Sequence, residues 1–313
     1  MSLPSSPSLV RGGKVGTEVV QASVDQKMTS MEYLVLNLCD PTLRERSLTE
    51  LSKEREMFPD LAPLLWYSFG TIVALVQEIL RIYPALSPPT LTSAASTRVC
   101  NALTLFQCVA SRPETRSSFI EADIPLYLYP FLRTLDKAQA FEQLRLATLG
   151  VIGALVKDEN TKVTEYLLKC ETIPLCLNIM EIGNEPSKTV STFILLKVLR
   201  NEVGLRHCCD TRGPFYDIAF ALQKRVNSPD ERPSARLLRC IIQCYLRLLD
   251  HPRGHAVLKT WFPSVLQTGT FNDYLMKDPS MQECLQQLLA KLEGGSPIRS
   301  LHFLRCSDNA IIP

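Results

Sequence analysis

The sequence predicts an all-α fold, an armadillo- or HEAT-like superhelix of stacked helical repeats. Apolar residues recur at helical spacing along nearly the whole chain. No window alternates apolar and polar residues between turn signals, as a half-buried strand would. Similar segments also return after about 40–50 residues, which is the period of armadillo and HEAT repeats.

The composition agrees with a packed helical core. Hydrophobic residues make up 46% of the 313 residues and charged residues 21%, so most of the chain should be globular. Only 7% of the residues are aromatic, and a leucine-rich core suits helices better than a β-sandwich. A net charge of +2 requires neither nucleic acid nor an acidic membrane as a partner.

Three regions follow from the distribution of these residues. Residues 1–25 are rich in Ser, Pro and Gly, and we predict a disordered leader rather than a signal peptide. Residues 26–292 should form one armadillo-repeat domain. Residues 293–313 are predicted to be a C-terminal tail, because Gly-Gly-Ser-Pro at 294–297 stops a helix. No apolar run is long enough to span a membrane, so we expect no membrane partner.

The helices can be placed in order. Residues 60–83 are predicted to form one long helix, with Asp60 as N-cap, Pro63 in the first turn and Pro84 after its end. Asp123 should cap another helix that has Pro125 in its first turn, and a further helix should start at Glu171 or Thr172. The remaining helices are expected at residues 93–110, 113–122, 140–157, 186–201, 215–226, 233–249 and 279–292.

Internal repetition is the feature that decides the fold. The segments IPLYLYPFL and IPLCLNIME start at residues 124 and 173, 49 residues apart, and a longer apolar helix follows each. Such units cannot bury their apolar faces alone, so they stack. Gly150 and Gly153 lie inside one of these helices, where each costs about 1 kcal/mol relative to alanine. They indicate either close packing between helices or a flat place for a bound peptide.

No set of residues predicts catalysis, a metal site or a cofactor. His251 and His255 have helical spacing but lack the glutamate of a zinc-protease motif and a third ligand. Cys208 follows His207 directly, and adjacent helical residues do not face each other. The eleven cysteines have no zinc-site spacing, and we expect reduced thiols in the cytoplasm or nucleus.

One cationic stripe predicts an alternative function. Arg236, Arg239 and Arg247 recur on one face of the helix at 233–249. This stripe is either an ordinary solvated face or the lining of a groove that meets an acidic peptide or phosphate. Arg145 and Lys188 would extend it if consecutive long helices line the same groove. The alternative function is therefore weak nucleic-acid binding through a basic groove.

Five segments closely resemble the required-for-cell-differentiation family, the armadillo-repeat subunit of the CCR–NOT mRNA deadenylase complex. They are DLAPLLWYSFGTIVALVQEI, NALTLFQCVASRPETRSSF, IPLYLYPFL, RLATLGVIGALVK and PSARLLRCIIQCYLRL. The resemblance implies a non-enzymatic adaptor in mRNA decay, translational repression and RNA-mediated silencing. Its implied partners are the large Not scaffold and short peptides of RNA-binding or silencing proteins, with a second copy of this chain as a further candidate. Its implied location is the cytoplasm, including P-bodies, and the nucleus.

The resemblance also implies which residues meet the scaffold. The scaffold contact maps onto Tyr67, Phe69, Val73 and Leu80, although the family commonly has histidine at the position of Tyr67. Their spacing is compatible with one broad face of a helix. The same pattern alone would also fit an internal core position.

Two peptide sites are implied as well. The concave peptide groove maps onto Gly150 and Val190, and Gln143 stands where the family usually has an aromatic residue.

The tryptophan pocket of the family departs further from its pattern in this chain. Arg212 and Pro214 replace its tyrosine and arginine, and only Arg253 is kept. We therefore expect a divergent paralogue that retains scaffold binding and binds tryptophan-containing peptides weakly.

Overall fold

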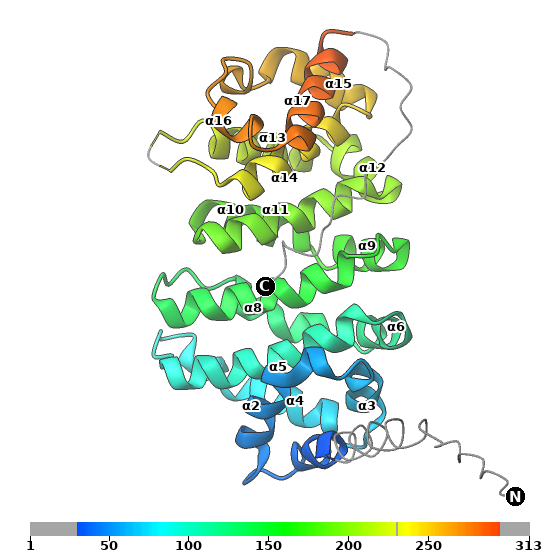
Figure 1. The fold of residues 1–313 in the computed structure, drawn as a ribbon, viewed down its shortest axis with the longest axis vertical. Helices are drawn as coiled ribbons and strands as arrows, with labels where there is room; N and C mark the ends of the chain where they lie inside the picture. The colour runs from blue at the N-terminus through cyan, green and yellow to red at the C-terminus, as the bar shows by residue number, and fades with distance from the viewer. Residues whose placement is uncertain (1–29, 230, 295–313) are drawn as a thin grey trace, which may run out of the picture.

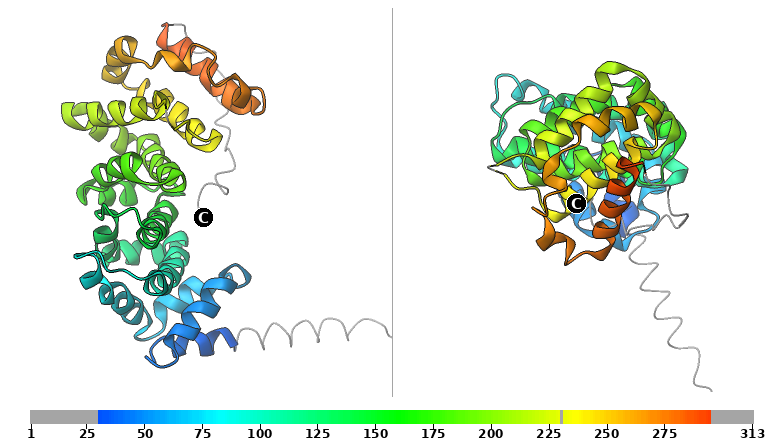
Figure 2. Two further views of the ribbon diagram at one scale, coloured as in Figure 1. Left: turned by 90° about the vertical axis from the view of Figure 1, so that its left-hand side faces the viewer. Right: turned by 90° about the horizontal axis from the view of Figure 1, so that it is seen from above.

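The computed structural model describes residues 30–229 and 231–294, and these residues form a superhelix of stacked helices (Figure 1). No strand occurs among them, which confirms the all-α prediction. Figure 2 shows in its left view that the stack is curved, so that both ends bend toward the same side. The described part of the chain contains no single helix that is both long and apolar enough to cross a membrane, although the bent pair α3 and α4 passes by length and composition.

The helices form three parallel stacks. In the first stack each long helix packs on the next: α5 (Ser93–Ser111), α8 (Gln139–Val156), α11 (Glu185–Arg200), α14 (Ala235–Leu248) and α17 (Pro279–Leu292). The second stack consists of α3 (Leu61–Tyr67), α6 (Pro113–Glu121), α9 (Thr161–Lys169), α12 (Glu202–Asp210) and α15 (Pro252–Trp261). Each long helix therefore belongs to a unit of three helices, which is the armadillo form of the repeat rather than the two-helix HEAT form.

In each unit, the helix of the third stack follows the helix of the second stack in the sequence and precedes the long helix of the first stack. It comprises α4 (Thr71–Arg81), η3 (Ile124–Leu128) with α7 (Tyr129–Leu132), α10 (Thr172–Ile182), α13 (Arg212–Val226), and η4 (Ser264–Leu266) with α16 (Asn272–Leu275). Before the first full unit come helical residues 30–37, α2 (Arg44–Glu54) and η1 (Arg55–Met57), and η2 (Tyr83–Ala85) follows α4.

Hydrogen bonds between neighbouring units join residues separated by nearly the same number of positions. The hydroxyl of Tyr83 donates to the carbonyl of Tyr127, 44 residues later. The Tyr129 and Thr172 hydroxyls bond to each other across 43 residues. These contacts between adjacent units therefore join residues 43 or 44 positions apart, which lies within the predicted period of about 40–50 residues.

The helix predicted at residues 60–83 is in fact two helices, and this prediction was wrong. The chain turns at Ser68–Gly70, and the axes on either side differ by 88°. Gly70 has a φ of +79°, a left-handed conformation that glycine adopts without strain. Asp60 precedes α3, but its side chain makes no capping hydrogen bond.

A second departure concerns the segment IPLYLYPFL. Its counterpart IPLCLNIME forms most of the continuous helix α10, whereas this segment forms η3 and the single turn α7. Pro130 has no amide hydrogen and stands where the counterpart has Ile179, so it cannot continue the hydrogen-bond pattern of a helix. Asp123 has a φ of +53° and makes no side-chain cap, so the predicted N-cap was wrong.

The last described helix ends at the limit predicted for it. Helix α17 ends at Leu292, and Gly294 has a φ of +85°, typical of a helix stop. The predicted leader at residues 1–25 and the tail from residue 295 lie outside the described residues.

Candidate partner-binding surface

The turn between α3 and α4 presents an apolar corner to solvent. Helix α3 ends at Tyr67, Ser68 is extended, and left-handed Gly70 begins the approach to α4. Phe69 stands at the apex between the two helices, and 99% of its surface is exposed. A phenylalanine in this position gains nothing from the core of the protein, so its large apolar surface is available to a partner.

The four residues implied by the resemblance all lie on the surface. Tyr67 is 69% exposed, Val73 61% and Leu80 40%. Val73, Gln77 and Leu80 follow the spacing of one helical stripe, and this stripe is the exposed side of α4. The alternative interpretation, that these residues are internal core, was therefore wrong. They are divided between α3, the turn and α4 rather than placed on one helix.

The opposite face of α4 is held by a buried ion-pair cluster. Glu78 is only 2% exposed. Its carboxylate oxygens form ion pairs with a guanidinium nitrogen of Arg44 on α2 at 3.2 Å and with Nε of Arg98 on α5 at 2.6 Å. Burial raises the pKa of the Glu78 carboxyl, but the hydrogen bonds and charges of Arg98 and Arg44 outweigh it, so this pKa lies below its ordinary value. The cluster ties α4 to two neighbouring helices and so fixes the orientation of Val73 and Leu80.

Cys39 supports the turn from the side of the N-terminal helix. Its Sγ donates a hydrogen bond to the Phe69 carbonyl at 3.4 Å. A Cβ atom at Gly70 would lie 3.2 Å from the same sulfur. Glycine at this position is required both by the left-handed backbone and by this close approach.

Three further exposed apolar side chains near this end of the chain were missed by the sequence reasoning. Tyr33 is 62% exposed, Leu36 63% and Met57 66%. The buried stripe of the first helix runs through Met31 and Val35, so Tyr33 and Leu36 fall outside it. Apolar residues that do not fit the buried stripe of an amphipathic helix are the signal that could have found them.

The predicted peptide groove is formed only in part. Gln143 is exposed on α8, as a groove residue should be. Val190 is 2% exposed, so the prediction that it lines an open groove was wrong. Gly150 is buried, and a Cβ there would lie 3.3 Å from Oε1 of Gln107 on α5. Of the two interpretations of Gly150, close packing between helices is the one that the geometry supports.

The residues assigned to the degraded tryptophan pocket lie where α12, α13 and α15 meet. Arg253 uses its guanidinium to donate to the carbonyls of Cys209 and Asp210 at the end of α12. Arg212 is exposed and Pro214 is half-buried in the first turn of α13. Arg253 is thus occupied as a link between two repeats, which is a structural role.

The predicted basic groove does not form. Arg145 is fully buried and donates to Thr134, Asp136 and Glu142, so it holds a loop against α8. Lys188 is 4% exposed and lies 2.5 Å from Glu231. For these two residues the nucleic-acid prediction was wrong.

The three arginines on α14 differ from one another. Arg239 is paired with Asp278, and Arg247 with Glu202 and Asp250. Arg236 is exposed and makes no ion pair with any residue in the described part of the chain. Because two of the three charges are neutralised by acids of the protein, the stripe is mainly a set of links between repeats.

Within residues 30–229 and 231–294 the thiols and histidines do not assemble a reactive site. Burial raises the pKa of Cys208 to about 12 and that of Cys209 to about 11, the direction opposite to that needed for a nucleophile. His251 pairs with Asp210 at 3.1 Å, and His255 contacts the Lys291 carbonyl. No group of three or more metal-ligating side chains is present among the residues described.

Comparisons with known proteins agree with this architecture. The model of the cell differentiation family, Rcd1-like, matches residues 34–292. The chain is 50% identical over 258 residues to cell differentiation protein rcd1 of Schizosaccharomyces pombe, covering 82% of this chain and 91% of that protein. It is 47% identical over 250 residues to protein CAF40 of Saccharomyces cerevisiae, covering 80% of this chain and 67% of that protein.

A solved structure supports the fold. A designed armadillo repeat protein in complex with the peptide (KR)4 superimposes with a TM-score of 0.54, covering 84% of this chain and 99% of that chain. The sequence identity is 14%, so the likeness concerns the fold alone.

Proposed function

The chain belongs to the Rcd1-like cell differentiation family, and from that premise we propose that it is a non-enzymatic adaptor subunit of a CCR–NOT deadenylase complex. In this role its α3–α4 surface binds the large Not scaffold, and other faces recruit short peptides of repressor proteins. The armadillo fold suits such a role because stacked repeats present extended surfaces for partners.

The exposed Phe69 carries this proposal. Nearly all of its surface faces solvent, and Tyr67, Val73 and Leu80 on the two flanking helices are exposed apolar side chains as well. Clustered exposed apolar residues on an otherwise packed domain are typical of protein–protein interfaces. Aromatic residues in such interfaces commonly contribute most of the binding free energy. The ion-pair cluster behind α4 holds this surface in one geometry, which lowers the entropy lost on binding.

The experiment is co-purification of the full chain with the central region of the Not scaffold. Phe69→Ala combined with Val73→Tyr removes the apex aromatic and adds bulk to the α4 stripe. Both residues are exposed, so we expect the variant to keep its thermal melting temperature and to lose the scaffold. Loss of an interface anchor of this kind costs about 2 kcal/mol or more, which is over tenfold in affinity.

Phe220→Ala is the matched control. Phe220 is also an exposed phenylalanine, 64% accessible, but it lies on α13 in a later repeat. This variant should co-purify with the scaffold as the natural chain does. A folded Phe69 and Val73 double variant that still co-purifies would overturn the proposal.

The nucleic-acid alternative is not advanced as a second function. Its candidate cations are mostly buried or neutralised, as described above. Recruitment of peptides remains part of the proposal, with Gln143 as the groove residue that is open to solvent.

A further inference from the structure

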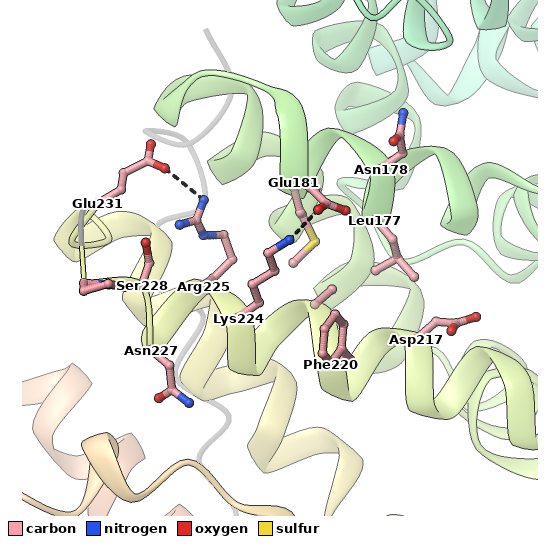
Figure 3. A pocket seen from close by; sticks show the side chains of 13 residues that line it. Leu177, Asn178, Glu181, Asp217, Phe220, Lys224, Arg225, Asn227, Ser228 and Glu231 are labelled. Carbon is pink, nitrogen blue, oxygen red and sulfur yellow. Dashed lines mark hydrogen bonds and ion pairs between the residues drawn. The ribbon is translucent and has the colours of Figure 1, made fainter.

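A hollow of about 550 Å³ lies between α10 and α13, bordered by the turn that follows α13 (Figure 3). None of its lining residues belongs to the α3–α4 surface or to the residues assigned to the peptide sites above. Its volume falls within the range of sites that hold small ligands or single peptide segments.

The middle of the hollow is apolar. It is lined by Leu177 and Met180 of α10 and by Phe220 and Ala221 of α13. Phe220 on α13 is 64% exposed, and Leu177 on α10 is half-buried. A large apolar side chain of a ligand would cover this ring and remove it from water.

Some of the charged side chains around the hollow are paired and one is not. Lys224 pairs with Glu181 across the hollow, and Arg225 lies 3.1 Å from Glu231. Asp217, by contrast, has neither hydrogen bond nor ion pair to any residue that the structure describes, and it is exposed. One end of the hollow therefore offers an unpaired carboxylate.

The opposite end has an excess of positive charge. Glu231 pairs with both Arg225 and Lys188, at 3.1 Å and 2.5 Å, so two cations share one carboxylate there. An acidic side chain of a ligand would therefore be attracted to this end. Figure 3 shows Asp217 and Arg225 toward opposite sides, with Phe220 and Leu177 between them.

We propose that this hollow binds an extended peptide with a basic residue, a large apolar residue and an acidic residue at alternate positions. The basic side chain of the peptide pairs with Asp217, the apolar side chain covers Phe220, and the acidic side chain lies near the Arg225 guanidinium. Asp217 and Arg225 are eight residues apart on one helix, which is about 12 Å. Side chains at positions i and i+4 of an extended chain lie about 13 Å apart on one face, so the spacing matches.

This inference rests on the recruiting role in the proposed function and gives it a site and a ligand class. It is independent of the scaffold surface, because α10 and α13 lie in later repeats than α4. Phe220→Ala should abolish peptide binding and leave scaffold co-purification intact. Failure of one proposal is therefore distinguishable from failure of the other.

The test uses two capped probe peptides, Lys-Ser-Leu-Ser-Glu and its reverse Glu-Ser-Leu-Ser-Lys, titrated into the full chain and followed by amide NMR. We expect one of the two directions to shift the signals of residues that line the hollow. Asp217→Lys should weaken this binding by about tenfold or more, because like charges then meet. The same variant should prefer a probe in which glutamate replaces the lysine.

Tyr216→Ala is the control, since Tyr216 is exposed on α13 next to Asp217 but does not line the hollow. It should leave the affinity unchanged, whereas Arg225→Gln, which removes the positive charge, should reduce the affinity. The proposal is overturned if neither probe direction shifts the lining residues. It is equally overturned if the charge reversal at Asp217 fails to reverse the preference, or if Tyr216→Ala weakens binding as much as Phe220→Ala.

Discussion

At the scale of single residues, Gly70 determines how the α3–α4 corner is built. Its left-handed φ allows the chain to turn by 88° between two helices, and the absence of a Cβ lets Cys39 reach the Phe69 carbonyl. The exposure of Phe69 depends on both. Gly70 thus allows Phe69 to be the most exposed aromatic residue of the described surface.

Gly70→Ala should therefore lower the free energy of unfolding by about 1–2 kcal/mol, since an L-residue is strained in the left-handed region. The Cβ contact with Cys39 at 3.2 Å adds to this effect. Chemical denaturation of the two proteins measures the difference.

The control is Gly213→Ala in the first turn of α13, where a Cβ would meet nothing within 4 Å. Here alanine should leave stability unchanged or raise it by up to about 0.5 kcal/mol, because it favours the helix. Equal losses in both variants would contradict this account of Gly70.

At the scale of elements, helix α4 has one face that is exposed to solvent and one that packs against neighbouring helices. Val73 and Leu80 face solvent, while Glu78 is buried between Arg44 and Arg98. Removing one partner of a buried ion pair leaves uncompensated charge and is strongly destabilising. The ion pairs of Glu78 on the buried face therefore hold the exposed face of α4 in its orientation.

Glu78→Gln should lower the free energy of unfolding by about 3 kcal/mol at neutral pH. The pKa of Glu78 is depressed in the folded state, so its contribution is complete above the ordinary glutamate pKa, about 4.3. This contribution is lost as the pH falls below that value and through the folded-state pKa. The difference between natural chain and variant should accordingly shrink on acidification, as measured by denaturation at several pH values.

Glu50→Gln on α2 is the comparison, because Glu50 pairs with Arg46 at 2.7 Å on the exposed surface. An exposed pair of this kind contributes less than about 1 kcal/mol. A difference between natural chain and Glu78→Gln that does not change with pH would show that the carboxylate charge is not what matters.

At the scale of the whole molecule, the long helices form a continuous inner stack with its most buried point at α11. Every residue from 187 to 199 is buried there, including Lys188 and Lys197. Helices α8, α10, α12 and α14 all pack against it. In a repeat protein each unit contacts only its neighbours, so local stability follows the local burial.

Hydrogen exchange should reflect this gradient. We expect the amides of α11 to exchange more slowly than those of α15, in which only Gly254 and Leu258 are buried. Exchange measured by mass spectrometry on the full chain tests this expectation. Similar rates in both helices would mean that the stack opens as one cooperative unit.

The helical class, the repeat period and most helix limits could be predicted from the sequence. These features depend on local patterns, such as apolar spacing, prolines in first turns and glycine after Leu292. Helices α2, α9 and α12 were not among the helices placed from the sequence, and two predicted segments depart because of a local exception. The left-handed Gly70 divides one predicted helix, and Pro130 shortens another.

Which of the candidate site residues face solvent was decided by the tertiary structure. The sequence suggested Arg145 and Lys188 as groove cations, but Arg145 is buried against the loop that precedes its own helix, and Lys188 is buried and pairs with Glu231 of the next repeat. Phe69 could equally have been core, and only the corner between α3 and α4 exposes it. Periodicity records that a residue lies on a helix, whereas its burial depends on neighbours about 43 residues away, which no local pattern specifies.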